Sequence, residues 1–130
     1  MAKPDLVGIA VEHMPRALAF YRMLGLEIPP EMDAEDHVEF VTEGGFRLAW
    51  DTVELIESFS GTWTKPVGHR MGLAFVCDTP ADVDALYAQA IERGVTGLKA
   101  PWDAFWGQRY ATLQDPDGNP VDLYAWLPSA

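Results

Sequence analysis

The sequence predicts an α+β fold built from two similar halves. A short apolar run at residues 6–11 is followed by a helical stripe, and a second run at residues 71–76 is followed by another. In both halves, segments with the period-two pattern of β-strands follow the helix. The chain has 130 residues, 48% of them hydrophobic, which is enough for one well-buried core. We therefore expect one domain over residues 1–130, with modules over about 1–66 and 67–130.

The first half opens with an expected strand and helix. Residues 6–11 are nearly all apolar, as in a strand at the centre of a sheet. Pro15 suits the first turn of a helix, and Gly25 ends it. The apolar stripe between them consists of Ala17, Leu18, Phe20, Tyr21 and Leu24.

A hairpin is expected next. Residues 37–41 alternate with period two, and Gly44 and Gly45 turn the chain into a partner strand over 46–50. The segment from there to about residue 67 mixes apolar side chains with Ser, Thr, Gly and Pro. That mixture predicts a partly structured connection instead of a regular element.

The second half repeats this order. Thr79 suits an N-cap, Pro80 the first helical position and Gly94 the helix end. The stripe between them consists of Val83, Leu86, Tyr87, Ala90 and Ile91. Strands are expected at 95–99, 108–113 and 121–126, with a turn at 115–120.

Composition restricts the partners and the compartment. The net charge of −11 repels phosphate backbones and anionic lipids, so we expect no nucleic-acid or membrane partner. A cationic ligand would be attracted, although acidic surfaces mainly serve solubility. Cys77 is the single cysteine and no signal peptide is evident, so the expected compartment is the cytoplasm. No apolar run approaches the roughly 20 residues that span a bilayer.

Two segments carry a resemblance to a known family. Residues 6–11 with 17–26 resemble the opening of the vicinal oxygen chelate superfamily, which includes glyoxalases, bleomycin-resistance proteins and extradiol dioxygenases. Residues 106–110, leading into the turn and strand at 115–123, resemble the ending of its second module. The resemblance implies two βαβββ modules that form a curved, mixed eight-stranded sheet around a central cavity. It also implies a homodimer.

Enzymes of this superfamily hold a divalent metal with His, Gln or Glu side chains from the first and last strands of both modules. The resemblance places Leu6, Gly72, Leu48 or Trp50, and Asp122 at these positions. Only Asp122 can bind a metal, and a stable site needs three or four protein donors. We therefore expect no metal and no other cofactor, as in the bleomycin-resistance branch. A different donor set remains open from His69, His37, Glu39 and Asp51.

The candidate ligand-binding residues are mostly aromatic. Five tryptophans are many for this length, and indole rings stack on flat ligands and attract cations. Any single aromatic residue more often fills a core. By the family mapping, Trp50 and Asp122 face the cavity, and Asp122 either accepts a hydrogen bond from the ligand or pairs with Arg109 or Arg47. The predicted ligand contacts are Trp50, Trp63, Trp102, Phe105, Trp106, Tyr110 and Asp122.

Three functions are compatible with these residues. The favoured one is a metal-free protein that sequesters an aromatic or cationic small molecule, such as an antibiotic to which it confers resistance. The second is a glyoxalase- or dioxygenase-like enzyme with an unrecognised metal site or with Asp122 as a general acid or base. The third is a scaffold whose aromatics serve packing alone. No catalytic residue is predicted, since Cys77 has no nearby histidine to activate it.

Overall fold

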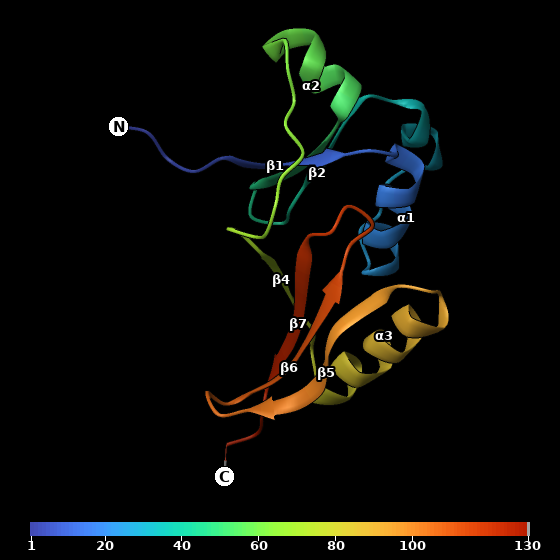
Figure 1. Ribbon diagram of the computed structural model, residues 1–130. Coiled ribbons are helices and arrows are strands. Elements are labelled where there is room, and N and C mark those ends of the chain that lie inside the picture. The colour runs from blue at the N-terminus through green and yellow to red at the C-terminus, as the bar shows by residue number, and fades with distance from the viewer. Residues whose placement is uncertain (130) are drawn as a thin grey trace. The chain divides into compact units, whose positions relative to one another are not determined.

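The computed structural model describes residues 1–129 and divides into two compact units, with unit one ending at Lys65 and unit two beginning at Pro66 (Figure 1). The α+β class is confirmed, with three α-helices and two mixed sheets of three and four strands. One continuous eight-stranded sheet is not seen among the described residues. None of the helices in residues 1–129 has the length and apolarity needed to cross a bilayer.

Unit one contains a three-stranded sheet in the order β1-β3-β2. Strand β1 runs parallel to β3, whereas β2 runs antiparallel to it. The elements of unit one are β1 (Leu6–Val11), α1 (Met14–Met23), the 3₁₀ helix η1 (Pro30–Ala34), β2 (His37–Val41), β3 (Arg47–Thr52) and α2 (Val53–Ser60).

Helix α1 begins and packs as its sequence predicts. The His13 side chain accepts a hydrogen bond from the Arg16 backbone N–H at the N-cap, and a proline occupies the first turn. The buried residues of the helix include Leu18 and Tyr21, both at 0% exposure. The Tyr21 ring contacts the Trp50 indole of β3, with ring centroids 5.2 Å apart. This helix therefore covers one face of the unit-one sheet.

Two segments of unit one differ from the expected βαβββ order. No strand lies between α1 and β2, where the chain forms η1 instead. The Arg22 guanidinium holds this segment by donating to the carbonyls of Ile28 and Pro29 and by pairing with Asp33 at 2.9 Å. After β3, the segment expected to be irregular begins with helix α2, because Thr52 caps its N-terminus through the Leu55 backbone N–H.

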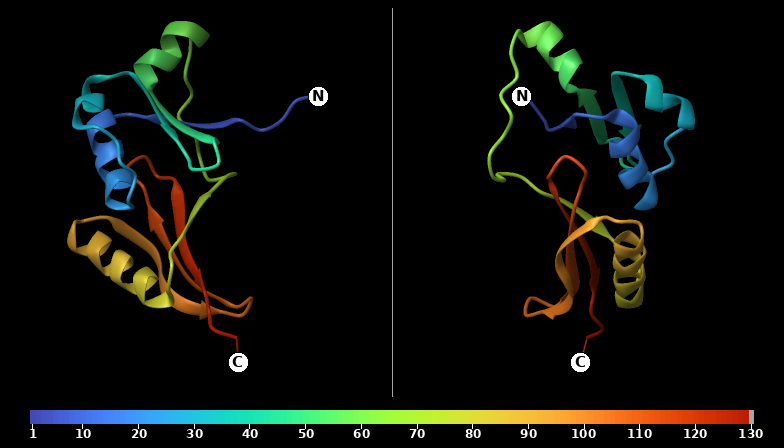
Figure 2. Two further views of the ribbon diagram at one scale, coloured as in Figure 1. Left: turned by 180° about the vertical axis from the view of Figure 1, so that it is seen from behind. Right: turned by 45° about the vertical axis from the view of Figure 1, so that its right-hand side comes forward.

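Unit two contains a four-stranded sheet in the order β4-β7-β6-β5. Strand β4 is parallel to β7, and the other two neighbouring pairs are antiparallel. Helix α3 lies along one face of this sheet and starts with a complete capping box between Thr79 and Asp82 (Figure 2). The elements are β4 (Leu73–Val76), α3 (Pro80–Glu92), β5 (Thr96–Ala104), β6 (Gln108–Gln114) and β7 (Pro120–Trp126).

The turn between β6 and β7 is organised by one buried acid. Asp115 is 3% exposed, and its carboxylate accepts hydrogen bonds from the backbone N–H groups of Asp117 and Asn119 and from the Asn119 side-chain amide. Gly118 takes a φ of 91°, which favours glycine. This turn fixes the register of β6 against β7, and so fixes which side chains stand opposite one another.

Candidate functional site

The unit-two sheet has one covered face and one open face. Along β6 and β7, alternate residues such as Ala111, Leu113 and Leu123 are fully buried. Arg109 shares their side of β6 and pairs with Asp84 of α3, so this side faces the helix. The residues between them point to the other side, which we call the open face. It carries Tyr110, Thr112, Asp122 and Tyr124, all of them half-exposed.

Strand register arranges the open face in two rows across the sheet. In the first row, Trp102 of β5 stands opposite Tyr110 of β6, and Tyr110 opposite Tyr124 of β7. The second row follows the same strands and continues to β4: Lys99, Thr112, Asp122 and Ala74. An aromatic row therefore runs beside a row that contains one basic and one acidic side chain.

Asp122 accepts hydrogen bonds from both neighbouring hydroxyls. The Tyr110 hydroxyl donates to Oδ2 at 2.6 Å, and the Thr112 hydroxyl donates to Oδ1 at 2.9 Å. The expected alternative of an ion pair between Asp122 and Arg109 is wrong. Arg109 pairs with Asp84 and Asp103, and Arg47 pairs with two acids of unit one. Within the described residues of unit two, no basic side chain lies within 4.0 Å of the Asp122 carboxylate.

The Tyr110 hydroxyl keeps its proton. Partial burial, followed by the hydrogen bond to Asp122, raises the pKa of Tyr110 from 10.0 to about 12. The hydroxyl is therefore a hydrogen-bond donor over the physiological range. Two donors fix the orientation of the carboxylate, and each carboxylate oxygen retains further acceptor capacity.

Aromatic rings form a continuous ladder over the open face and the β5–β6 turn. Trp106 is central, with its ring centroid 5.5 Å from Trp102, 4.9 Å from Phe105 and 5.2 Å from Tyr110. The contacts continue from Tyr110 to Tyr124 at 6.1 Å and from Tyr124 to Trp126 at 6.4 Å. The aromatic ladder consists of Trp102, Phe105, Trp106, Tyr110, Tyr124 and Trp126.

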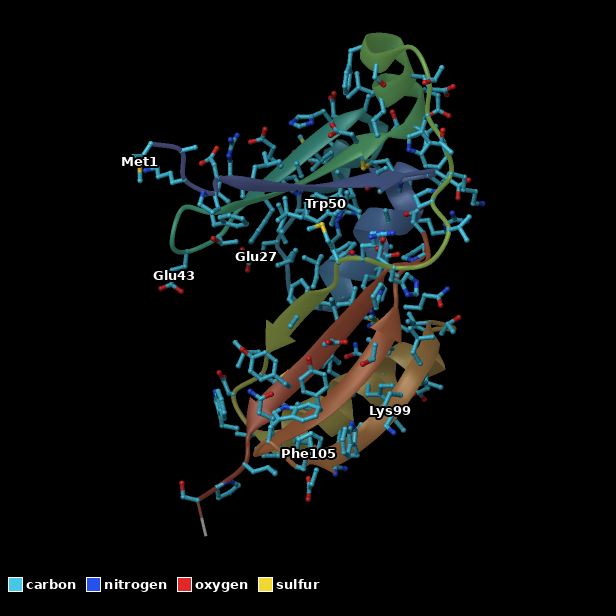
Figure 3. All side chains as sticks on the ribbon, turned by 60° about the vertical axis from the view of Figure 1, so that its left-hand side comes forward. Met1, Glu27, Glu43, Trp50, Lys99 and Phe105 are labelled. Atoms are coloured by element: carbon cyan, nitrogen blue, oxygen red, sulfur yellow. The ribbon has the colours of Figure 1, made fainter. Side chains whose placement is uncertain are left out.

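Several members of the ladder are accessible to solvent. Phe105 is 90% exposed at the β5–β6 turn, where Figure 3 labels it, and Trp106 and Trp126 are 45% and 66% exposed. Exposed large aromatics that touch one another form an apolar patch of the kind that marks a binding surface. The Trp106 indole N–H donates to the Gln108 amide oxygen at 2.8 Å, which orients the ring.

Five of the seven predicted contact residues lie together in unit two. Four belong to the aromatic ladder, and the fifth, Asp122, is hydrogen-bonded to one of them, Tyr110. The prediction omitted Lys99, Thr112, Tyr124 and Trp126. Period-two alternation along residues 108–114 and 120–126 would have placed Thr112, Tyr124 and Trp126 on the same face as Tyr110 and Asp122.

Trp50 and Trp63 belong to unit one. We expected the Trp50 indole to face a cavity, but it is 0% exposed and lies against Tyr21 in the core (Figure 3). Its indole nitrogen is buried without a hydrogen-bond partner. Trp63 is half-exposed in the irregular segment after α2.

The residues at the superfamily's metal-binding positions do not form a donor set for a metal. Leu48 and Trp50 lie on the α1 side of the unit-one sheet. On the open face of unit two, the neighbours of Asp122 are Ala74, which has no donor atom, and Thr112, whose hydroxyl already binds the carboxylate. One carboxylate and one hydroxyl fall short of the three or four donors required.

The alternative donor set is also not assembled in the described residues. His37 binds Asp51 through Nδ1 and Glu39 through Nε2 at 2.8 Å, so the two carboxylates lie at opposite edges of the ring. His69 binds the carbonyl of Gly118 at 2.8 Å. Residues 1–129 contain no group of three or more His, Cys, Asp or Glu side chains arranged to hold one ion.

The two carboxylates bound to His37 change its pKa and connect it to a longer series of ion pairs. Hydrogen bonds to Asp51 and Glu39 raise the pKa of His37 above 6.5. Glu39 also accepts from Arg47 at 3.0 Å, and Arg47 pairs with Asp5. The resulting charged row alternates in sign across the unit-one sheet, so each carboxylate in it has a basic partner.

Comparisons with known proteins agree with this architecture. A sequence model of the Glyoxalase/Bleomycin resistance protein/Dioxygenase superfamily matches residues 3–123. A glyoxalase/bleomycin resistance protein/dioxygenase family enzyme from Burkholderia phytofirmans PsJN has 25% identity and a TM-score of 0.78, covering 97% of this chain and 100% of that one. A comparison with proteins of curated function gives no match.

Two structures from Agrobacterium tumefaciens are also similar. A protein of unknown function from strain C58 has 32% identity and a TM-score of 0.70, covering 98% of this chain and 95% of that one. The solution structure of protein ATC0852 has 27% identity and a TM-score of 0.69, covering 98% of this chain and 100% of that one.

Proposed function

Because the chain belongs to the glyoxalase/bleomycin resistance protein/dioxygenase superfamily, we propose that it binds a small aromatic or cationic molecule on the open face of unit two, without a metal. Sequestration of an antibiotic in this way would confer resistance to it. The observation that carries the proposal is the Asp122 carboxylate, which is oriented by two hydroxyls, has no basic partner among the described residues of unit two and lies beside the aromatic ladder.

The aromatic ladder supplies the affinity for a flat ligand. Tyrosine and tryptophan rings offer large contact areas and lose little conformational entropy on binding. Because Trp106 and Trp126 are partly exposed, a ligand ring that covers them removes apolar surface from water. Stacking against such rings contributes roughly 0.5 to 1.5 kcal/mol per contact beyond that burial.

Asp122 supplies the preference for a cation. A carboxylate in water loses hydration when a ligand covers it, and a ligand cation replaces that hydration with a charge-assisted hydrogen bond. The two hydroxyls hold the carboxylate in place, so little ordering is needed on binding. The net charge of −11 attracts cations toward the protein as a whole.

The proposal is tested with a matched pair of ligands in isothermal titration calorimetry. N-methylacridinium is a planar cation, and acridine, at a pH where it is uncharged, is nearly the same shape. We expect the cation to bind more tightly, and Asp122→Asn to weaken cation binding by about tenfold, because the attraction between the ligand's positive charge and the carboxylate is lost. Binding of acridine should change little.

Asp103→Asn is the matched control for that substitution. This substitution removes the same charge from the same sheet. Asp103, however, lies on the α3 face, where it pairs with Arg109 and is 66% exposed. Arg109 keeps Asp84 in this variant. Equal loss of cation affinity in the two variants would mean that net charge, and not the open face, governs binding. Absence of binding by both acridines in the wild-type protein would reject the proposal.

An enzyme is the second candidate, favoured by the 2.6 Å hydrogen bond that joins the Tyr110 hydroxyl to the Asp122 carboxylate. Such a pair could exchange a proton with a bound substrate, with Asp122 as the base. The two functions differ in the fate of the ligand. A sequestering protein releases its ligand unchanged in mass and configuration, whereas an enzyme converts more than one equivalent.

A further inference from the structure

Lys99 is the basic residue of the open face. It lies on β5 in register with Thr112, which is in register with Asp122. Its ammonium lies 4.9 Å from the centroid of the Trp102 ring, a distance typical of a cation–π contact. Figure 3 labels this lysine on its strand.

The Lys99 ammonium has no acidic partner within the described part of unit two, although the chain contains 20 acidic and only 9 basic residues. Lys65, by contrast, reaches the carboxylate of Glu12 at 3.7 Å. In an acidic protein, an ammonium that rests on an indole instead of a carboxylate indicates that this indole accepts cations.

The contact between Lys99 and Trp102 is replaceable. Lys99 is exposed and keeps its hydration on the solvent side, and cation–π contacts at exposed sites are weak. A more weakly hydrated organic cation loses less hydration when it takes the same position. The Trp102 ring remains fixed by its edge contact with Trp106, at 89° between the ring planes.

We propose that the Trp102 ring is a cation subsite that Lys99 occupies in the free protein and that a cationic ligand takes over. The inference rests on the proposed function and narrows its ligand class to organic cations. Lys99 then acts as an internal competitor, because its charge repels a ligand cation and its ammonium occupies the ring. Removing Lys99 should strengthen the binding of cations more than the binding of neutral analogues.

The test substitutes Lys99→Met, which keeps an unbranched side chain without the charge. Lys65→Met is the control, since it removes the same charge from an exposed lysine of unit one. Calorimetry with N-methylacridinium and uncharged acridine gives the ratio of the two affinities. We expect K99M to raise the cation-to-neutral ratio about two- to fivefold, the strength of one exposed cation–π contact, and K65M to leave the ratio unchanged.

A double-mutant cycle shows whether Lys99 acts through the ring. In a Trp102→Leu background, K99M should raise the ratio clearly less than in the wild-type background, because only the charge repulsion remains once the ring for which Lys99 and the ligand compete is absent. An equal rise in both backgrounds would overturn the proposal, as would a ratio that K99M leaves unchanged or lowers.

Nuclear magnetic resonance provides a readout of the displacement itself. The ring current of Trp102 should shift the Lys99 side-chain methylene signals upfield in the free protein, and W102L should abolish that shift. Saturation with N-methylacridinium should move these signals back toward ordinary lysine values. If the cation binds and the signals stay, only the subsite is rejected. If neither wild-type protein nor K99M binds either probe, the proposed function fails together with the subsite.

Discussion

The hydrogen bond between Tyr110 and Asp122 can be tested by deleting a single oxygen atom. Tyr110→Phe removes the hydroxyl that donates to the carboxylate at 2.6 Å and keeps the ring. Tyr124→Phe is the matched control, because its ring lies nearly parallel to that of Tyr110 at 6.1 Å and is half-exposed in the same sheet. Tyr124 donates no hydrogen bond to Asp122, which in unit two accepts from the hydroxyls of Tyr110 and Thr112.

The expected difference between the two variants follows from the charge of the acceptor. A hydrogen bond to an ionised group contributes about 1.5 to 3 kcal/mol, and partial exposure of both partners lowers this value. We therefore expect Y110F to lower the free energy of unfolding by about 1 kcal/mol more than Y124F does. Urea unfolding followed by tryptophan fluorescence measures both values. Equal destabilisation by Y110F and Y124F would refute the assignment.

The pH dependence tests the surroundings of the Tyr110 hydroxyl, because burial and, after it, the hydrogen bond to Asp122 raise the pKa of this group. The pKa of Tyr110 is raised from 10.0 to about 12 in the folded protein, so its contribution to stability is complete below pH 10 and is lost as the pH rises through about 12. A shift of two units corresponds to at most about 2.7 kcal/mol, and solvent screening reduces it toward the value above. Wild-type protein should therefore lose its advantage over Y110F across this interval. A difference that stays constant would contradict the assigned hydrogen bond.

Three further predictions concern the fold and the charged row. Gly97→Ala places a methyl group 2.0 Å from the Tyr87 hydroxyl and should cost about 1 to 3 kcal/mol in urea unfolding, whereas Gly8→Ala meets nothing closer than 3.8 Å and should cost less. The pKa of His37 is raised in the folded protein, so the stability that His37 contributes is complete below about pH 6.5 and is lost as the pH rises through that raised pKa. His37→Asn should remove this pH dependence of the free energy of unfolding. If the pH dependence is the same in the variant, the charged row does not contribute as assigned. Elemental mass spectrometry after loading with divalent metals and dialysis should find far less than one ion per chain; a stoichiometric metal would restore the enzyme as the leading candidate.

Local sequence signals predicted most of the unit-two fold and several elements of unit one. Thr79 and Pro80 start α3, and Pro15 lies in the first turn of α1, because capping and proline geometry act within one turn of the chain. The family prediction is confirmed by the match over residues 3–123. The second strand of the implied first module is missing, because Arg22 holds the segment after α1 in a 3₁₀ helix through contacts that no local pattern indicates.

The orientation of Trp50 could not be read from its strand alone. Its strand, β3, has the burial pattern of a central strand, with buried residues on both faces, so alternation gives no sign of which side faces the helix. The strand register gives the orientation of Trp50. Trp50 stands opposite Val38, which is also buried, whereas the next residue, Asp51, stands opposite the exposed His37. The partners of Asp122 were missed for a related reason, because they lie across the strands and not along the sequence.

The two units carry different chemistry on corresponding positions of their sheets. Gly8 and Ala74 each lie five residues before a helix N-cap, and each is paired in parallel with the last strand of its sheet. From this alignment, the pairs His37–Asp51 and Glu39–Ala49 correspond to Tyr110–Tyr124 and Thr112–Asp122. In unit one, a ligand cation would have to displace a basic side chain that already neutralises each carboxylate of the charged row. In unit two, hydroxyls orient Asp122 without neutralising it, so a ligand cation gains the full interaction there. This difference is why we assign the ligand to the open face of unit two.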